Sequence, residues 1–204
     1  MRVPRCLVLA SASPRRLELV RGAGLDPRVV APRIDETARA GEPPDLRVSR
    51  LAREKAQAVA DDLVTRIPCA VVLAADTEVV LDGLALGKPR DPADAAAMLR
   101  ALRGRGHDVL TGVHVLRLDE PRSASSVTLT HVRFRSYDDA VLRAYVASGE
   151  PLDKAGAYGI QGLGAELVES VDGSWTNVVG LPVEQLPEWL DRIGIRLADL
   201  RPDP

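Results

Sequence analysis

Three lysines could do chemistry that the other basic residues of this chain cannot. Of the 27 basic residues, only Lys55, Lys88 and Lys154 are lysine, and the others are arginine. A lysine ammonium is a compact point charge, whereas an arginine guanidinium is a planar fork. Chance would also explain this distribution, but we expect the three lysines to serve sites that need a compact cation. Asn177, the sole asparagine, is a candidate for a specific role on the same ground.

Asp76 and Lys88 follow two neighbouring apolar runs of the chain. Residues 70–75 predict a buried strand that ends at Asp76 and Thr77, and residues 78–81 predict a second strand on the way to Lys88. Open α/β sheets bind ligands at the ends of their strands. We therefore expect a carboxylate, a hydroxyl and an ammonium to line a polyanion site at one edge of a sheet.

A second group of polar residues surrounds the predicted start of a helix. Residues 7–10 read as a strand, and Ser13 is a favourable N-cap for a helix that begins directly after it. Exposed backbone N–H groups and the positive end of the helix dipole suit a phosphate at this place. Arg15 and Arg16 lie in the first turn, where a cation works against the dipole. Ser11, Arg15 and Arg16 are therefore candidates for phosphate binding, and idle surface positions are the weaker interpretation.

Glu36 and Lys55 complete the set of charged candidates. Glu36 lies in a polar predicted loop, residues 33–44, where an acidic residue is most often solvated and a metal ligand is the alternative. Lys55 lies beside the apolar stripe of a helix predicted over residues 45–62, so its ammonium can point into a cleft. Several cations with few carboxylates suit a polyphosphate bound to Mg²⁺ or Mn²⁺. The sequence has no serine–histidine pattern, which favours attack by water with Asp76 as general base.

The glycine-rich segment 153–162 is predicted to be a loop whose backbone approaches a ligand closely. Its glycine spacing matches neither a Walker P-loop nor a Rossmann fingerprint. Gln161 in this segment, together with Thr77 and Asn177, has a side chain that could read the edge of a ligand.

Bulk properties are those of an ordinary globular protein. The 204 residues suit one domain, with room for two lobes and a substantial core. A net charge of −2 provides no basic field for nucleic acid, and the sequence has neither a membrane-length apolar run nor a signal-peptide pattern. The two cysteines lie in apolar runs and are expected to be reduced core residues, as in a cytoplasmic protein.

Periodicity and capping signals predict the remaining elements. We expect a short strand over 28–31, helices over 92–103, 138–148 and 182–193, an antiparallel strand pair over 109–118 and 127–134, a last strand over 165–171, turns at 82–83 and 173–177, and a frayed tail from Arg196.

Eight short motifs occur in order along the chain, at residues 9–16, 34–36, 52–56, 75–77, 86–89, 111–113, 154–162 and 177–182. Together they resemble the Maf family of nucleoside triphosphate pyrophosphatases, also named septum formation inhibitors, over nearly the whole chain. The resemblance implies an α/β fold similar to inosine triphosphate pyrophosphatases, with an elongated mixed sheet flanked by helices. It also implies two lobes around a cleft, in a single Maf-like domain over residues 1–204.

The resemblance further implies metal-dependent hydrolysis of nucleoside triphosphates to monophosphate and pyrophosphate, in proteins that are often homodimers. Residues 155–162 are similar to the branch that acts on dTTP and UTP. A glutamine amide matches the donor and acceptors of uracil and thymine, although it can turn to suit CTP. The implied site comprises catalytic Glu36, Lys55, Asp76 and Lys88, substrate-binding Ser11, Arg15, Arg16, Thr77 and Gln161, and a Mg²⁺ or Mn²⁺ ion near Glu36 and Asp76.

Two other functions stay open at this point. The chain could be a pyrophosphatase for a modified or methylated nucleotide, or a nucleotide-binding regulator of cell division with little catalysis. Neither a nucleic acid nor a membrane is an expected partner. Glu78 stands where the family usually has an apolar residue. We expect a harmless edge-strand position or, alternatively, an additional acidic ligand or a perturbation of Asp76.

Overall fold

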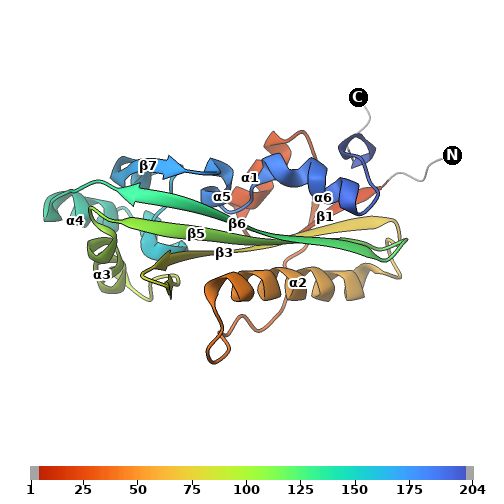
Figure 1. The fold of residues 1–204 in the computed structure, drawn as a ribbon, viewed down its shortest axis with the longest axis horizontal. Helices are drawn as coiled ribbons and strands as arrows, with labels where there is room; N and C mark the ends of the chain where they lie inside the picture. Colours follow the sequence, from red (N-terminus) through yellow and green to blue (C-terminus); the bar gives the residue numbers. More distant parts are fainter. Residues whose placement is uncertain (1–4, 201–204) are drawn as a thin grey trace. The chain divides into compact units, whose positions relative to one another are not determined.

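The apolar runs of the chain form one mixed sheet in the computed structural model, which describes residues 5–200 (Figure 1). The strands are β1 (Cys6–Ala10), β2 (Arg28–Val29), β3 (Ala70–Leu81), β4 (Leu84–Leu86), β5 (Gly106–Arg117), β6 (Arg122–Phe134) and β7 (Val168–Asp172). They lie in the order β2-β1-β3-β5-β6-β7, and β4 pairs with β3 outside this path. Because β1 is parallel to β2 and β3 while β4 and β7 are antiparallel to their partners, the predicted mixed α/β class is confirmed.

Helices and short 3₁₀ turns connect these strands. They are α1 (Pro14–Gly22), α2 (Pro44–Leu63), α3 (Pro92–Leu102), α4 (Asp139–Ala147), η1 (Glu150–Asp153), η2 (Ala155–Ala157), η3 (Leu163–Leu167), α5 (Trp175–Val179), η4 (Val183–Gln185), α6 (Leu186–Arg192) and η5 (Leu197–Leu200). Across residues 5–200, no helix combines the length and the apolar character that crossing a bilayer requires.

The chain forms two compact units. The first comprises Met1–Asp76, Thr111–Thr128 and Gly180–Pro204, and the second comprises Thr77–Leu110 and Leu129–Val179. The expectation of one Maf-like domain with a cleft stays a prediction.

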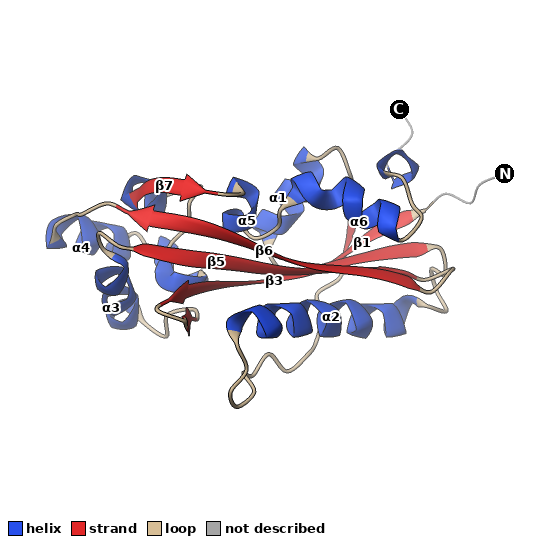
Figure 2. Cartoon of the chain, in the orientation of Figure 1, coloured by secondary structure: helices blue, strands red, loops and turns tan. Residues whose placement is uncertain are grey.

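Both faces of the strands are buried in the first unit. Side chains alternate along a strand, so Leu7 and Leu9 of β1 point to one face and Val8 and Ala10 to the other. The parallel register pairs β1 with residues 70–74 of β3, which continue the same alternation. Helix α2 covers the face of Val8, and α1 and α6 cover the face of Leu9 (Figure 2). Near-continuous apolar strands are typical of parallel sheet regions with helices on both sides.

Helix α2 passes very close to β5 at Gly112. A Cβ atom at this position would lie 2.3 Å from the carbonyl oxygen of Val48 and 2.7 Å from the backbone nitrogen of Ser49. Those are backbone atoms of α2, which cannot turn aside as the end of a side chain can. A glycine is therefore required for α2 to lie where it does.

We expect Gly112→Ala to lower the free energy of unfolding by about 2–3 kcal/mol, because the added methyl group forces α2 away from β5. Denaturant unfolding followed by circular dichroism measures the change. Gly22→Ala is the matched control, since a Cβ atom at Gly22 would meet no atom within 4 Å. Equal stability of the two variants would contradict the close approach.

An aromatic cluster lies in the core of the second unit. Phe134 meets His107 and Tyr158 edge to face, with ring centroids 5.0 Å and 4.7 Å away. The Nε2 atom of His107 is 2.9 Å from the hydroxyl of Tyr158, and its Nδ1 atom is buried without a hydrogen-bond partner. Burial lowers the pKa of His107 to about 4, so the ring is neutral at neutral pH.

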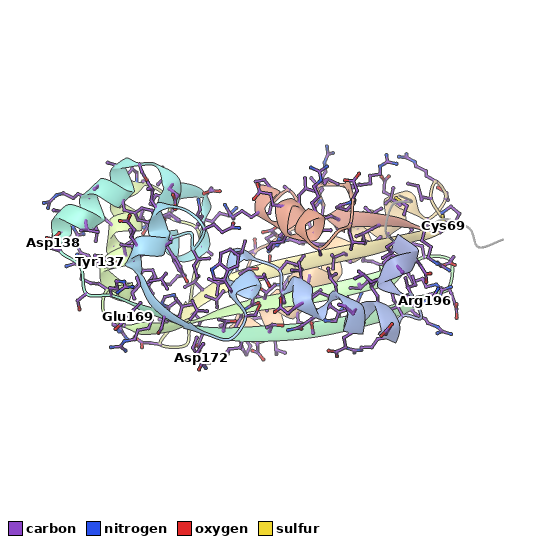
Figure 3. The ribbon with its side chains drawn as sticks, turned by 90° about the horizontal axis from the view of Figure 1, so that it is seen from above. Cys69, Tyr137, Asp138, Glu169, Asp172 and Arg196 are labelled. Carbon is purple, nitrogen blue, oxygen red and sulfur yellow. The ribbon has the colours of Figure 1, made fainter. Side chains whose placement is uncertain are left out.

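Helices α3 and α4 pack beside this cluster through Tyr137. Its hydroxyl donates a hydrogen bond of 2.7 Å to the carbonyl oxygen of Leu99, and the guanidinium of Arg103 lies 5.1 Å from its ring centroid. The next residue, Asp138, caps α4 by accepting hydrogen bonds from the backbone of Ala140 and Val141 (Figure 3).

The protein should lose stability as the pH falls from about 6.5 to about 4. The pKa of His107 is 6.5 in an unfolded chain and about 4 in the folded protein, so the unfolded state takes up the proton first. The full shift is worth about 3 kcal/mol of unfolding free energy. Urea unfolding of the wild type and His107→Gln at pH 7, 5.5 and 4 measures this contribution. The same pH dependence in both proteins would contradict it.

The prediction that a strand ends at Asp76 is wrong. β3 is one continuous strand, and Asp76 and Thr77 lie in its middle. A polar side chain does not end a strand whose backbone continues to pair, and β3 continues into the hairpin with β4. Asp82 and Gly83 form the predicted hairpin turn, both with positive φ.

Three predictions near the C-terminus are also wrong. Residues 165–167 belong to η3 rather than to the last strand, and residues 175–177 begin helix α5 rather than a turn. Residues 197–200 form η5 instead of fraying, because Leu200 packs into the core and is 6% exposed. The rest of the expected frayed tail, 201–204, lies outside the described residues.

Candidate active site

Ser11 organises the start of helix α1. Its Oγ atom accepts a hydrogen bond of 3.1 Å from the backbone of Ser13, the N-cap residue, and one of 3.4 Å from Nη1 of Arg16. Arg16 also donates from Nε to the carbonyl oxygen of Gly180, at 2.9 Å. The buried hydroxyl of Ser11 thus holds both the helix start and one guanidinium.

Lys55 lies between two carboxylates. Its Nζ atom donates to Oδ1 of Asp76 at 2.6 Å and forms an ion pair with Oε1 of Glu36 at 3.0 Å. Lys55 is 6% exposed and Asp76 is 8% exposed, so this pair is buried. The side chain of Glu36, in contrast, is 59% exposed. The Lys55 ammonium thus contacts two other predicted site residues, and the expectation that it points into a cleft stays a prediction.

The loop that carries Glu36 is held to helix α2 by Arg50. Its guanidinium binds both carboxylate oxygens of Glu42, at 2.5 Å and 2.7 Å, and also donates to the carbonyl oxygen of Thr37 at 3.3 Å. The hydrogen bonds from Arg50 hold the pKa of Glu42 at about 2. Arg47 donates to the carbonyl oxygen of Glu36 itself, at 3.4 Å. This clamp was not predicted from the sequence, because nothing in the residue spacing pairs Glu42 of the loop with a helix residue eight positions later.

Arg16 belongs to the same electrostatic environment. Burial of its guanidinium lowers its pKa, while the charges of Asp76 and Glu36 act in the opposite direction and Arg15 adds to the lowering. The first unit therefore brings together Ser11, Arg15, Arg16, Glu36, Lys55 and Asp76, which are six of the nine predicted site residues.

The donor set suits a divalent cation that is shared with a substrate. Glu36 and Asp76 both approach one point, which the ammonium of Lys55 occupies. Within residues 5–200 no cluster of three or more His, Cys, Asp or Glu side chains could hold a metal. Mg²⁺ is usually bound by one or two carboxylates together with substrate phosphates, and two carboxylates fit that pattern.

Thr77, Lys88 and Gln161 belong to the second unit. Thr77 is half-buried in β3, whereas Lys88 and Gln161 are exposed on loops. The backbone of Gly156 donates a hydrogen bond of 3.1 Å to the carbonyl oxygen of Gly87. This bond joins the loop that carries Lys88 to the glycine-rich segment that carries Gln161. Their convergence with the residues of the first unit stays a prediction.

Comparison with known proteins adds an independent observation. The family described as Maf-like protein matches residues 6–193. The chain belongs to this family. A dTTP/UTP pyrophosphatase of Moorella thermoacetica is 52% identical to this Maf-like chain over 93% of it and 95% of the relative. One of Symbiobacterium thermophilum is 48% identical, over 92% and 94%. A solved nucleoside-triphosphatase / dITP/XTP pyrophosphatase of Mycobacterium abscessus is 15% identical and covers 64% of this chain and 72% of its own, with a TM-score of 0.38.

Two rare residues of the Maf-like chain have structural contacts that the sequence did not predict. The amide nitrogen of Asn177 donates to the carbonyl oxygen of Val109 and to Oγ1 of Thr130, both at 3.0 Å, and the residue is completely buried. Lys154 donates to the carbonyl oxygen of Glu150 at 2.6 Å. Asn177 therefore ties α5 to the sheet, and reading a ligand edge is the wrong role for it.

Glu78 lies within β3 and is 7% exposed. β3 pairs with β1 over residues 70–74 and with β4 over residues 79–81, so neither of these pairings includes Glu78. The edge-strand position and the additional acidic ligand both stay predictions.

We expect Lys55→Met to raise the affinity for Mn²⁺ in the absence of nucleotide at least about tenfold, because the ammonium no longer competes for two carboxylates. Electron paramagnetic resonance of unbound Mn²⁺ measures the affinity. Arg53→Met removes one positive charge from an exposed position of the same helix and should leave the affinity nearly unchanged. Equal affinities in the wild type and Lys55→Met would contradict the competition.

Proposed function

We propose that this protein hydrolyses dTTP and UTP to the nucleoside monophosphate and pyrophosphate. Support comes from relatives of that name at 52% and 48% identity over more than nine-tenths of both chains. The main structural support is the buried Lys55–Asp76 pair with Glu36 beside it. It supplies a carboxylate base, a cation for phosphate and a second carboxylate at one place.

Asp76 is proposed as the general base. Lys55 holds one oxygen of its carboxylate at 2.6 Å and so orients it within a buried site. A water molecule loses a proton to this carboxylate as its oxygen attacks the α-phosphorus atom. The bond between the α-phosphorus and the bridging oxygen then breaks, and pyrophosphate leaves with that oxygen.

Glu36 and Asp76 are the residues that would hold a Mg²⁺ or Mn²⁺ ion. Such an ion supplies Lewis-acid stabilisation of the charge on the phosphoryl oxygens when it is bound. The phosphate-binding residues in this proposal are Arg15, Arg16, Lys55 and Lys88, together with the backbone N–H groups at the start of α1.

Gln161 and Thr77 are proposed to select the base. Uracil and thymine present a donor between two acceptors, and the Gln161 amide offers one donor and one acceptor. When the Gln161 amide group rotates so that its donor and acceptor exchange places, it matches cytosine as well. CTP and modified pyrimidines are therefore the alternative substrates. A homodimer and a cytoplasmic location stay predictions.

The central test is the release of pyrophosphate from UTP and dTTP by the purified protein. We expect activity that needs Mg²⁺ or Mn²⁺, stops in chelator, and falls at least about 100-fold in Asp76→Asn, the range of general-base effects. Asp61→Asn, an exposed acidic residue of α2, should retain the activity of the wild type.

Three results would contradict the proposal. Release of single phosphates would place the cleavage at another bond. Unchanged activity in chelator would exclude the metal, and tight nucleotide binding without turnover would favour the regulatory alternative.

A further inference from the structure

The carboxylate of Glu150, which lies outside the glycine-rich segment 153–162, binds the backbone directly after that segment. Glu150, at the start of η1, accepts hydrogen bonds from the Tyr145 hydroxyl at 3.0 Å and from the backbone of Gly164 at 3.1 Å through Oε1. Its other oxygen, Oε2, accepts from the backbone of Leu163 at 2.8 Å. Three donors from two places in the chain thus meet at one side chain.

Two of those donors are the first backbone N–H groups of η3. The residue before them, Gly162, has no side chain that could cap the helical turn. The Glu150 carboxylate therefore does the work of an N-cap side chain, although it lies 13 positions before Leu163 in the chain. Its negative charge is also favourable at the start of a helix. Gln161 lies two residues before the first capped N–H group.

A second anchor lies on the other side of Gln161. The backbone of Gly159 donates a hydrogen bond of 3.1 Å to the hydroxyl of Tyr145, which itself donates to Glu150. Gln161 is thus enclosed between Gly159 and Leu163, which are both tied to the same pair of side chains. This short span leaves the Gln161 backbone little freedom.

The glycines of this segment make room for the two anchors. A Cβ atom at Gly162 would lie 2.4 Å from Oε2 of Glu150, and one at Gly164 would lie 2.6 Å from the Tyr145 hydroxyl. A larger residue at either position would push the backbone off the carboxylate or the hydroxyl. The glycine-rich motif thus has a packing reason beside any approach of the backbone to a ligand.

Glu150 is ionised under ordinary conditions. Burial raises its pKa, but the hydrogen bonds from Leu163, Gly164 and Tyr145 and the charge of Lys154 outweigh burial, so that the pKa lies below its usual value. A carboxylate accepts hydrogen bonds at both of its oxygens, whereas an amide of the same shape accepts at one atom and presents a donor at the other.

We propose that Glu150 is a positioning residue for base selection, which holds Gln161 in the orientation that reads the pyrimidine. The inference rests on the proposed function, because it assigns to Glu150 a role in the binding of the same substrate. Glu150 acts through Gln161 and need not touch the nucleotide.

The test is Glu150→Gln, which keeps the shape of the side chain but replaces one acceptor oxygen by a donor. We expect the KM for UTP to rise about tenfold, from the loss of charge-assisted hydrogen bonds, with kcat within about twofold of the wild type. Glu166→Gln is the matched control, because it makes the same chemical change at an exposed position of η3 and should alter neither constant.

A double-mutant cycle separates positioning from general destabilisation. In the Gln161→Ala background, Glu150→Gln should cause no further rise in KM, because the side chain that it positions is gone. A merely structural residue would lower the stability and cause the same change in both backgrounds. An unchanged KM in Glu150→Gln, or an equal rise in both backgrounds, would overturn the inference.

Tyr145→Phe provides a second variant if Glu150→Gln does not fold. It removes the hydroxyl that joins Gly159 to Glu150 but keeps the buried ring. We expect a smaller rise in KM that is again absent in Gln161→Ala, and an equal rise in both would count against positioning. A wild-type protein that releases no pyrophosphate from UTP or dTTP would overturn the proposed function and this inference together, whereas the outcomes above concern the inference alone.

Discussion

The ammonium of Lys55, held between Asp76 and Glu36, is the contact on which the site of the first unit depends. Removing ionised groups from water costs several kcal/mol for each ion unless the partner charge is close and well placed. The buried pair therefore needs helix α2 and strand β3 at a definite distance, and the loop of Glu36 must approach both. The apolar face of α2 and its contact at Gly112 supply that placement. The geometry of the candidate site therefore depends on the packing of the core.

In both units a charged side chain holds an irregular segment in place. The loop of Glu36 and the segment of Gln161 contain little regular structure, so apolar packing alone does not determine their conformation. In the first unit a cation, Arg50, gathers acceptors from the loop. In the second unit an anion, Glu150, gathers backbone donors. Each of these charged residues contacts the segment that carries a candidate site residue, although it was not itself a candidate in the sequence.

The contrast between Lys55 and Lys154 shows what the rarity of a residue type can and cannot predict about its role. Both are rare lysines, and both were expected at a site that needs a compact cation. Lys55 lies among the candidate site residues, whereas Lys154 binds a backbone carbonyl and the adjacent carboxylate of Asp153. Asn177 of α5 is likewise buried, and its amide donates hydrogen bonds to residues of β5 and β6. Rarity indicates that a residue has a specific partner, but that partner can be a ligand or the protein itself.

Short-range signals in the sequence were enough to predict strand β1, the start of α1 after Ser13, helix α3 from Pro92 and the turn at Asp82. Periodicity, caps and turn residues act over a few neighbours, and so they can be read locally. The three-dimensional structure was needed to show that β3 continues through Asp76, that Arg50 clamps the loop of Glu36 and that Glu150 caps η3. These outcomes depend on distances between residues far apart in the chain or in different elements, and such distances are set by how the helices pack on the sheet and not by local spacing.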